Sequence, residues 1–203
     1  MPTQAWFSVP VYVDKAQNQE LETIQKEISE VYQSLIFKQH PNWTSDTHEL
    51  SLDANGNFFN DCILSEKKAF NFLSFIDFHV DQYLKQIGCQ DRKRYIITQS
   101  WFTKTTKGKY AHLHAHGDHD ISGVYYFQTN GNDGSLFFPC MNRHLSSNFI
   151  FSQISSTTNT IPLETGVIAL WPSMLLHNTE PNNTDHERIS ISFNIKFLWN
   201  IKK

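Results

Sequence analysis

The middle of the chain contains a dense group of residue types that bind metals. Residues 111–120 include four histidines and two aspartates. In an extended segment, side chains two positions apart project from the same face, so those of one parity could converge on a single ion. His112, His114, His116 and Asp118 share one parity. The pattern therefore predicts a metal site.

Further candidates lie near the C-terminus. His177 follows an apolar run that ends in a proline turn, which would bring one imidazole to the end of a buried strand. Arg188 and Ser190 share a face of a predicted strand. A guanidinium binds a carboxylate through two parallel hydrogen bonds, and a serine hydroxyl adds a third donor. These residues favour a dicarboxylic keto acid beside the metal; the alternative is a surface arginine that balances Asp185 or Glu187.

The ligand types alone do not choose the metal, because imidazole suits zinc, copper, nickel and iron alike. A cysteine-free site that joins a His-x-[Asp/Glu/His] pair to a distant histidine is similar to the facial arrangement in Fe(II) oxygenases. That arrangement leaves coordination positions open for substrate and dioxygen. We therefore expect Fe(II), held on a small β-barrel.

Length and composition restrict the protein class. A chain of 203 residues with 39% hydrophobic residues predicts one domain, 1–203, that buries a substantial core. The net charge of −3 gives no electrostatic argument for nucleic acid, and no segment has the pattern of a signal peptide or a membrane span. The widely spaced Cys62, Cys89 and Cys140 indicate thiols in a reducing compartment. We therefore expect a cytoplasmic protein.

The pattern of elements changes near residue 94. Residues 1–93 predict a strand over 6–13, with Pro10 indicating a sheet edge, and supporting helices over about 21–35 and 65–87.

Residues 94–200 instead contain short runs of β-branched and aromatic residues between Gly, Asn, Asp and Pro clusters. These runs predict strands over 95–103, 121–127, 134–138, 167–171 and 189–197. The polar segment 141–160 predicts a long loop of the kind that often forms a lid. We expect an α+β protein whose C-terminal half is a barrel or two-sheet sandwich that carries the site.

The chain resembles the 2-oxoglutarate/Fe(II)-dependent dioxygenase superfamily, and within it a small oxygenase family of marine bacteria and tailed phages. The resemblance covers roughly residues 95–197. Its motifs are Gly108-Lys-Tyr110, His114-Ala-His116, Ser122-Gly-Val-Tyr-Tyr126, Glu164-Thr-Gly166, Trp171-Pro-Ser173, His177, Pro181-Asn182 and Arg188-Ile-Ser-Ile-Ser-Phe-Asn194. It implies a double-stranded β-helix (a jelly-roll or cupin-like barrel) with the N-terminal helices packed outside.

The resemblance also implies the metal ligands. By the family pattern these catalytic residues are His114, His116 and His177, so a histidine stands where the superfamily usually has a carboxylate. A literal His-x-Asp also occurs, from His116 to Asp118, and Asp118 stays open as an alternative carboxylate ligand.

The co-substrate implied by the resemblance is 2-oxoglutarate, with its distal carboxylate on Arg188 and Ser190. Tyr126 is a further candidate contact, because only one of Tyr125 and Tyr126 can face inward on a regular strand. The implied activity is that of a hydroxylase, which couples decarboxylation of 2-oxoglutarate to oxidation of a substrate.

Two other functions remain open at this point. One is a cupin-like metal enzyme that uses three histidines without 2-oxoglutarate, such as an isomerase or a thiol-type dioxygenase. The other is a non-catalytic barrel that carries a metal. The sequence does not distinguish a small-molecule from a peptide substrate. An edge strand at 6–13 could pair with a second copy of the chain, and a phage-encoded protein would work in the host cytoplasm.

Overall fold

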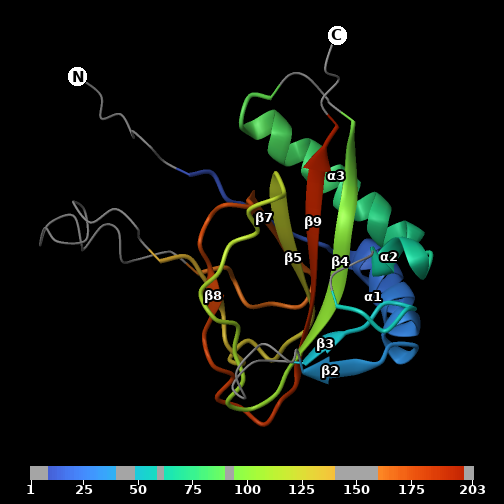
Figure 1. Cartoon of the computed structure of the whole chain (residues 1–203), viewed down its shortest axis with the longest axis vertical. Helices are drawn as coiled ribbons and strands as arrows, with labels where there is room; N and C mark the ends of the chain where they lie inside the picture. The colour runs from blue at the N-terminus through green and yellow to red at the C-terminus, as the bar shows by residue number, and fades with distance from the viewer. Residues whose placement is uncertain (1–8, 40–48, 59–61, 90–93, 140–159, 199–203) are drawn as a thin grey trace, which may run out of the picture.

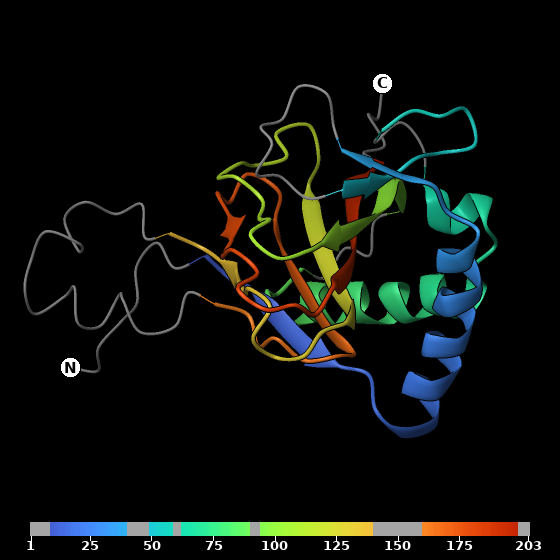
Figure 2. The same ribbon diagram turned by 90° about the horizontal axis from the view of Figure 1, so that it is seen from below.

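In the computed structural model, the described residues are 9–39, 49–58, 62–89, 94–139 and 160–198. Figures 1 and 2 show helices on one side of a large sheet and a small second sheet on the other side. None of the described helices is long and apolar enough to cross a lipid bilayer. The predicted loop 141–160 lies outside the described residues.

The helices are α1 (Asn18–Gln33), α2 (Ile63–Glu66) and α3 (Phe70–Gln86). The single helix predicted over 65–87 is therefore two, because the backbone turns at Lys68, which has a φ of 59°. Gly88, with a φ of 76°, follows the end of α3, a position where glycine commonly ends a helix. The carboxylate of Glu27 on α1 accepts hydrogen bonds from the backbone N–H groups of Asn71 and Phe72, at 3.1 and 2.8 Å. This contact satisfies the first turn of α3 and joins the two long helices.

The large sheet has seven strands in the order β1-β7-β5-β9-β4-β3-β2, and the paired strands are antiparallel. The strands are β1 (Tyr12–Lys15), β2 (Phe37–Gln39), β3 (Glu49–Ser51), β4 (Tyr95–Thr105), β5 (Ile121–Gln128), β7 (Val167–Pro172) and β9 (Arg188–Phe197). A second sheet pairs β6 (Leu136–Phe137) with β8 (Asn178–Thr179). This architecture confirms the expected double-stranded β-helix. The N-terminal strand is at the sheet edge, as expected, but it begins at Tyr12.

The two faces of the large sheet have different chemistry. On β9, residues 189, 191, 193 and 195 are apolar and fully buried in the core that also contains the helices. The residues that alternate with them are polar and face the interior of the barrel: Arg188, Ser190, Ser192 and Asn194. A central strand whose outer face is fixed by a hydrophobic core can hold these polar side chains in place. The functional site lies on that inner face.

Candidate metal centre

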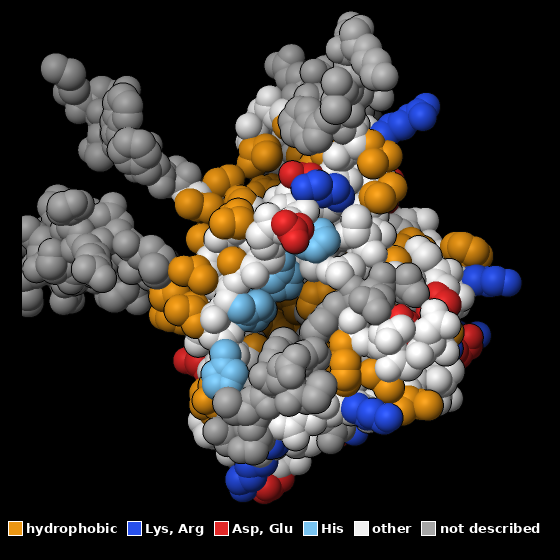
Figure 3. Space-filling view, in the orientation of Figure 1, with side chains coloured by type: hydrophobic (Ala, Val, Ile, Leu, Met, Phe, Trp, Pro, Cys, Tyr) orange, Lys and Arg blue, Asp and Glu red, His pale blue; other side chains and the backbone are white. Residues whose placement is uncertain are grey.

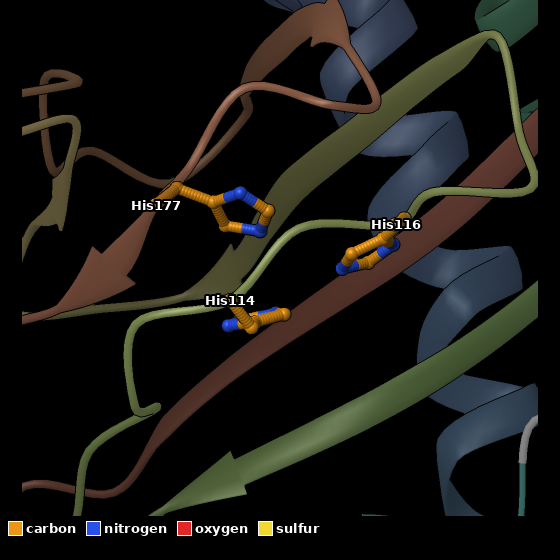
Figure 4. A group of neighbouring side chains, drawn as sticks. All are labelled: His114, His116 and His177. Carbon is orange, nitrogen blue, oxygen red and sulfur yellow. The ribbon is translucent and has the colours of Figure 1, made fainter. Parts of the chain in front are cut away.

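Three imidazoles meet inside the barrel. One ligand atom from each of His114, His116 and His177 lies within 4.8 Å of the other two. The ring centroids of His114 and His177 are 4.3 Å apart, and His116 lies 5.0 and 5.2 Å from them. Figure 4 shows the three side chains turned toward a common point from two segments of chain. The convergence predicted from the sequence is present.

Backbone pairing brings these distant segments together. The N–H and carbonyl groups of His114 and His177 exchange hydrogen bonds of 2.9 Å, and the N–H of His116 donates to Ser173 at 2.8 Å. The segment forms only this isolated bridge and no regular strand, so the expectation that residues 112–118 share one extended face is wrong.

The two same-parity neighbours stay outside the cluster. His112 and Asp118 are exposed, and neither is among the residues whose ligand atoms group together. Asp118 lies in a turn, and Lys196 donates to its backbone carbonyl at 2.7 Å, which ties this part of the loop to the C-terminal end of β9. The geometry therefore favours the three-histidine set over the alternative with Asp118.

Each imidazole is held by a hydrogen bond from its Nδ1 atom. The acceptors are the carbonyl of His112 for His114 (2.6 Å), the side-chain Oδ1 of Asn194 for His116 (2.7 Å) and the carbonyl of Leu175 for His177 (2.8 Å). An Nδ1–H donor leaves Nε2 with its lone pair available. All three rings are therefore oriented to offer Nε2 to one cation.

Burial keeps these rings neutral at physiological pH. Desolvation lowers the pKa of His177 to about 3 and that of His116 to about 4. It also lowers the pKa of His114. A neutral imidazole is the form that binds a metal, so the cluster needs no loss of protons at pH 7 before it can coordinate an ion.

Arg188 lines the same cavity as the three histidines and is only 2% exposed. Its Nη1 donates to the carbonyls of Asp133 (3.0 Å) and Gly134, and its Nη2 donates to Thr105 Oγ1 at 3.2 Å. Its Nε is buried without a hydrogen-bond partner among the described residues. Within that part of the chain no carboxylate forms an ion pair with the guanidinium, so the surface alternative with Asp185 or Glu187 is wrong.

Three hydroxyl groups lie beside Arg188 in this cavity. Ser190 is paired across the sheet with Tyr126 on β5 and with Thr103 on β4, and all three residues line the cavity. Tyr125 faces the opposite side, where its hydroxyl accepts a hydrogen bond from Gln25. The structure therefore brings the predicted co-substrate residues Arg188, Ser190 and Tyr126 together.

A second, more open cavity of about 270 Å³ adjoins the cluster on another side. It is lined by Gln99, Trp101, His114, His116, Gly117, Asp118, His119 and Asn194. Figure 3 shows histidine side chains along a hollow in this face of the molecule. His114, His116 and Trp101 line both cavities, so they lie between the deep cavity at Arg188 and the open one.

Sequence reasoning missed two side chains in this region. Trp171 lines the deep cavity, and its ring lies edge-on to His177 at 5.0 Å. Asn194 accepts the hydrogen bond from His116 described above. Its parity with Arg188 and Ser190 on β9 was the available signal that it faces inward.

Comparisons with known proteins show what this chain is similar to. Residues 99–194 match the model of a family described as "Putative 2OG-Fe(II) oxygenase". The comparison with curated proteins found no match.

Solved structures share the fold at low sequence identity. A prolyl hydroxylase from Trichoplax adhaerens, in complex with a hypoxia inducible factor peptide fragment, matches with a TM-score of 0.60 and 12% identity over 92% of this chain and 83% of that one. HygX from Streptomyces hygroscopicus, with nickel and 2-oxoglutarate bound, matches with a TM-score of 0.56 and 13% identity over 94% of this chain and 84% of that one. The viral collagen prolyl hydroxylase of Paramecium Bursaria Chlorella virus-1, in a 2-oxoglutarate complex, matches with a TM-score of 0.54 and 15% identity over 93% of this chain and 96% of that one.

The segment matched by the family model contains the three clustered histidines as well as Arg188 and Ser190. Residues 99–194 are therefore similar to this oxygenase family, and the chain shares its fold with these solved structures.

Proposed function

We propose that this protein is a hydroxylase that binds Fe(II) through His114, His116 and His177 and binds 2-oxoglutarate through Arg188. One observation carries the proposal: a buried guanidinium without a carboxylate partner among the described residues lines the same cavity as three oriented, neutral imidazoles. Hydrogen bonds and the charge of Asp133 stabilise the guanidinium in part, but no carboxylate of the described residues forms an ion pair with it, so this cavity is suited to an anion.

The donor set fits a divalent transition metal. Three neutral Nε2 atoms are good ligands for iron, and they leave positions for a co-substrate and dioxygen. When bound, the iron would supply the oxidising chemistry. One oxygen atom of dioxygen would convert 2-oxoglutarate to succinate and carbon dioxide, and the other oxygen atom would enter the substrate. The protein's own contribution is to orient the reactants and exclude water.

The deep cavity fits the distal carboxylate of the keto acid. Arg188 Nε is the unpartnered donor among the described residues. Ser190 on the same strand, and Tyr126 and Thr103 on the two neighbouring strands, line the same cavity. Because Arg188 is already held by Thr105 and two carbonyls, little side-chain entropy would be lost when it binds the anion. The substrate, a small molecule or a peptide, would enter from the open cavity on the other side of His114 and His116.

The test uses iron-loaded protein under nitrogen and then under air. We expect added 2-oxoglutarate to change the absorption spectrum of the Fe(II) protein, and air to release succinate. In the variant Arg188→Met, the affinity for 2-oxoglutarate should fall by about 30- to 1,000-fold, because charge-assisted hydrogen bonds worth about 2–4 kcal/mol are lost. The affinity for the metal should stay the same.

The matched control is Lys107→Met, which removes a positive charge that pairs with Asp185 on the surface and does not line the cavity. It should bind 2-oxoglutarate as the parent does. A protein that loads iron but neither binds nor consumes 2-oxoglutarate would contradict the proposal.

The absence of a carboxylate from the described cluster favours a second candidate, a cupin-like three-histidine enzyme that does not use 2-oxoglutarate. Such an enzyme would bind iron, and 2-oxoglutarate would leave its spectrum unchanged. A non-catalytic barrel would bind the metal tightly and release no succinate even in the absence of substrate.

We also propose that the protein works in the cytoplasm. The free thiol of Cys62 supports a reducing environment. Cys140 lies outside the described residues.

A further inference from the structure

His116 differs from the other two histidines in how its Nδ1 atom is held. His114 and His177 donate to backbone carbonyls two residues earlier in the chain, which every sequence supplies. His116 donates to a side chain, Oδ1 of Asn194, at 2.7 Å. The tautomer of His116 therefore depends on one residue of β9.

The amide of Asn194 is oriented by neighbours on both adjacent strands. Its Nδ2 donates to Gln99 Oε1 at 3.0 Å, and its Oδ1 accepts a hydrogen bond from Ser122 Oγ at 2.8 Å. Gln99 and Ser122 are the direct register partners of Asn194 on β4 and β5. The three side chains thus form a row across the middle of the sheet, and Asn194 is only 2% exposed.

The same row also fixes the backbone of His116. Ser122 Oγ lies 2.9 Å from Ser173 Oγ, and the carbonyl of Ser173 accepts the N–H of His116. His116 is therefore tied to this network by its main chain and by its ring. A network with all members satisfied has one stable arrangement, whereas a rotated amide would break several bonds together.

The orientation of this amide decides which nitrogen of His116 is available. With Oδ1 toward the ring, Nδ1 carries the proton and Nε2 has its lone pair. With the amide rotated, its NH₂ group would face Nδ1, and the ring would have to carry its proton on Nε2. A protonated Nε2 cannot coordinate a metal.

We propose that Asn194 is a positioning residue that locks His116 in the Nδ1–H tautomer and so completes the metal centre. The inference rests on the proposed function in one respect, that His116 is a metal ligand. Asn194 supplies a neutral acceptor in the place where many metal sites have a carboxylate. It therefore orients the ring without adding a negative charge to a three-imidazole site.

The first test measures metal affinity alone, by competition of Co(II) with a chromogenic chelator. Asn194→Leu keeps the approximate volume but removes the acceptor, and its Co(II) affinity should fall by about 10- to 100-fold, the usual effect of losing such a partner. Asn194→Asp keeps an acceptor for His116 and for Ser122, and it should bind Co(II) at least as tightly as the parent. Circular dichroism and thermal melts establish that each variant is folded.

The matched control is Thr98→Val. The Thr98 hydroxyl lies 3.1 Å from Nδ1 of His119, a histidine outside the cluster, and Thr98 also contacts the backbone carbonyl of Asn194. This variant removes a hydroxyl–imidazole contact in the same region without changing the acceptor of His116. Its affinity for Co(II) should equal that of the parent.

The second readout is the tautomer itself. Long-range ¹H–¹⁵N NMR of metal-free, ¹⁵N-histidine-labelled protein should show His116 protonated on Nδ1, and Asn194→Leu should show a mixture with the Nε2–H form. Unchanged affinity and an unchanged tautomer in folded Asn194→Leu would overturn the inference, as would an Asn194→Asp variant as weak as Asn194→Leu. If the parent protein binds no Co(II), the proposed metal site itself fails, which is a distinguishable result.

Discussion

Replacing Gly134 with alanine tests whether the turn behind Arg188 controls co-substrate binding. Gly134 has a φ of 95°, and its carbonyl accepts a hydrogen bond from Arg188 Nη1. A Cβ atom at this position would lie 2.3 Å from the carbonyl oxygen of Glu180 and 3.1 Å from Arg188 Nη1. The first contact is with backbone, which cannot move aside as a flexible side chain can. The turn must shift, and Arg188 must shift with it.

The expected cost has two parts. The left-handed backbone of residue 134 costs an alanine about 1–2 kcal/mol relative to glycine, and forcing an extra carbon into a packed site typically costs about 1–3 kcal/mol. For a chain of this size each kcal/mol lowers the melting temperature by about 2–4 °C. We therefore expect Gly134→Ala to lower the melting temperature by about 4–20 °C and to weaken 2-oxoglutarate binding by more than about tenfold, the equivalent of 1.4 kcal/mol.

Gly131→Ala is the matched comparison in the same turn. Gly131 has a similar φ of 82°, but its Cβ would approach nothing closer than the carbonyl of Leu163 at 3.6 Å. Gly131→Ala should lower the melting temperature only by the cost of a left-handed alanine, and it should bind 2-oxoglutarate as the parent does. Thermal melts and 2-oxoglutarate titrations of both iron-loaded variants decide the matter. Equal melting temperatures and equal affinities in the two variants would refute the role assigned to the turn.

Two further predictions concern histidines on opposite sides of the sheet. His177→Ala should lower Co(II) affinity at least about tenfold, whereas His112→Ala, which alters an exposed histidine outside the cluster, should leave it unchanged in the same chelator assay; equal losses would contradict the ligand assignment. Burial lowers the pKa of His79, which contacts the Tyr12 hydroxyl at 2.7 Å, despite the opposing effect of Asp14. The unfolded chain therefore binds a proton that the folded chain does not, so stability is fully present above pH 6.5 and falls below it, by at most about 1.4 kcal/mol per pH unit for this group. Urea unfolding of metal-free protein at several pH values should show a shallower pH dependence for His79→Gln, and identical slopes would contradict the prediction.

The sequence predicted the convergence of His114, His116 and His177 because it carries two independent signals. One is the alternation of histidines, and the other is an apolar strand that ends near a third histidine. The predicted strands on either side fix the barrel, so the two segments have few ways to meet. Arg188 and Ser190 followed from strand parity, which survives small errors in strand boundaries.

Residue parity did not predict which side chains face the metal site where the chain is not a strand. His112 and Asp118 have the parity of the ligands, but their segment is held by individual hydrogen bonds to the 173–177 region, and each residue takes its own direction. Asn194 was missed for a different reason. Its importance depends on the register that places it beside Gln99 and Ser122, and register across strands that are distant in sequence is not encoded in the spacing of one strand.

The charge around the metal follows from which side chains the fold leaves beside it. In the proposed complex, divalent iron and the Arg188 guanidinium would bring three positive charges, and 2-oxoglutarate would bring two negative ones. In the usual arrangement of the superfamily, a carboxylate ligand cancels the remaining positive charge. In the proposed site His116 takes the place of that carboxylate, and its Nδ1–H donates to the neutral amide of Asn194. Asp118 lies on the outer cavity, where water screens its charge, and the buried carboxylate of Asp133 acts on Arg188, whose pKa it raises, but is not a metal ligand in the described cluster. This chain therefore differs from a site with two histidines and one carboxylate in the charge at the metal, while the barrel that holds the ligands is the same.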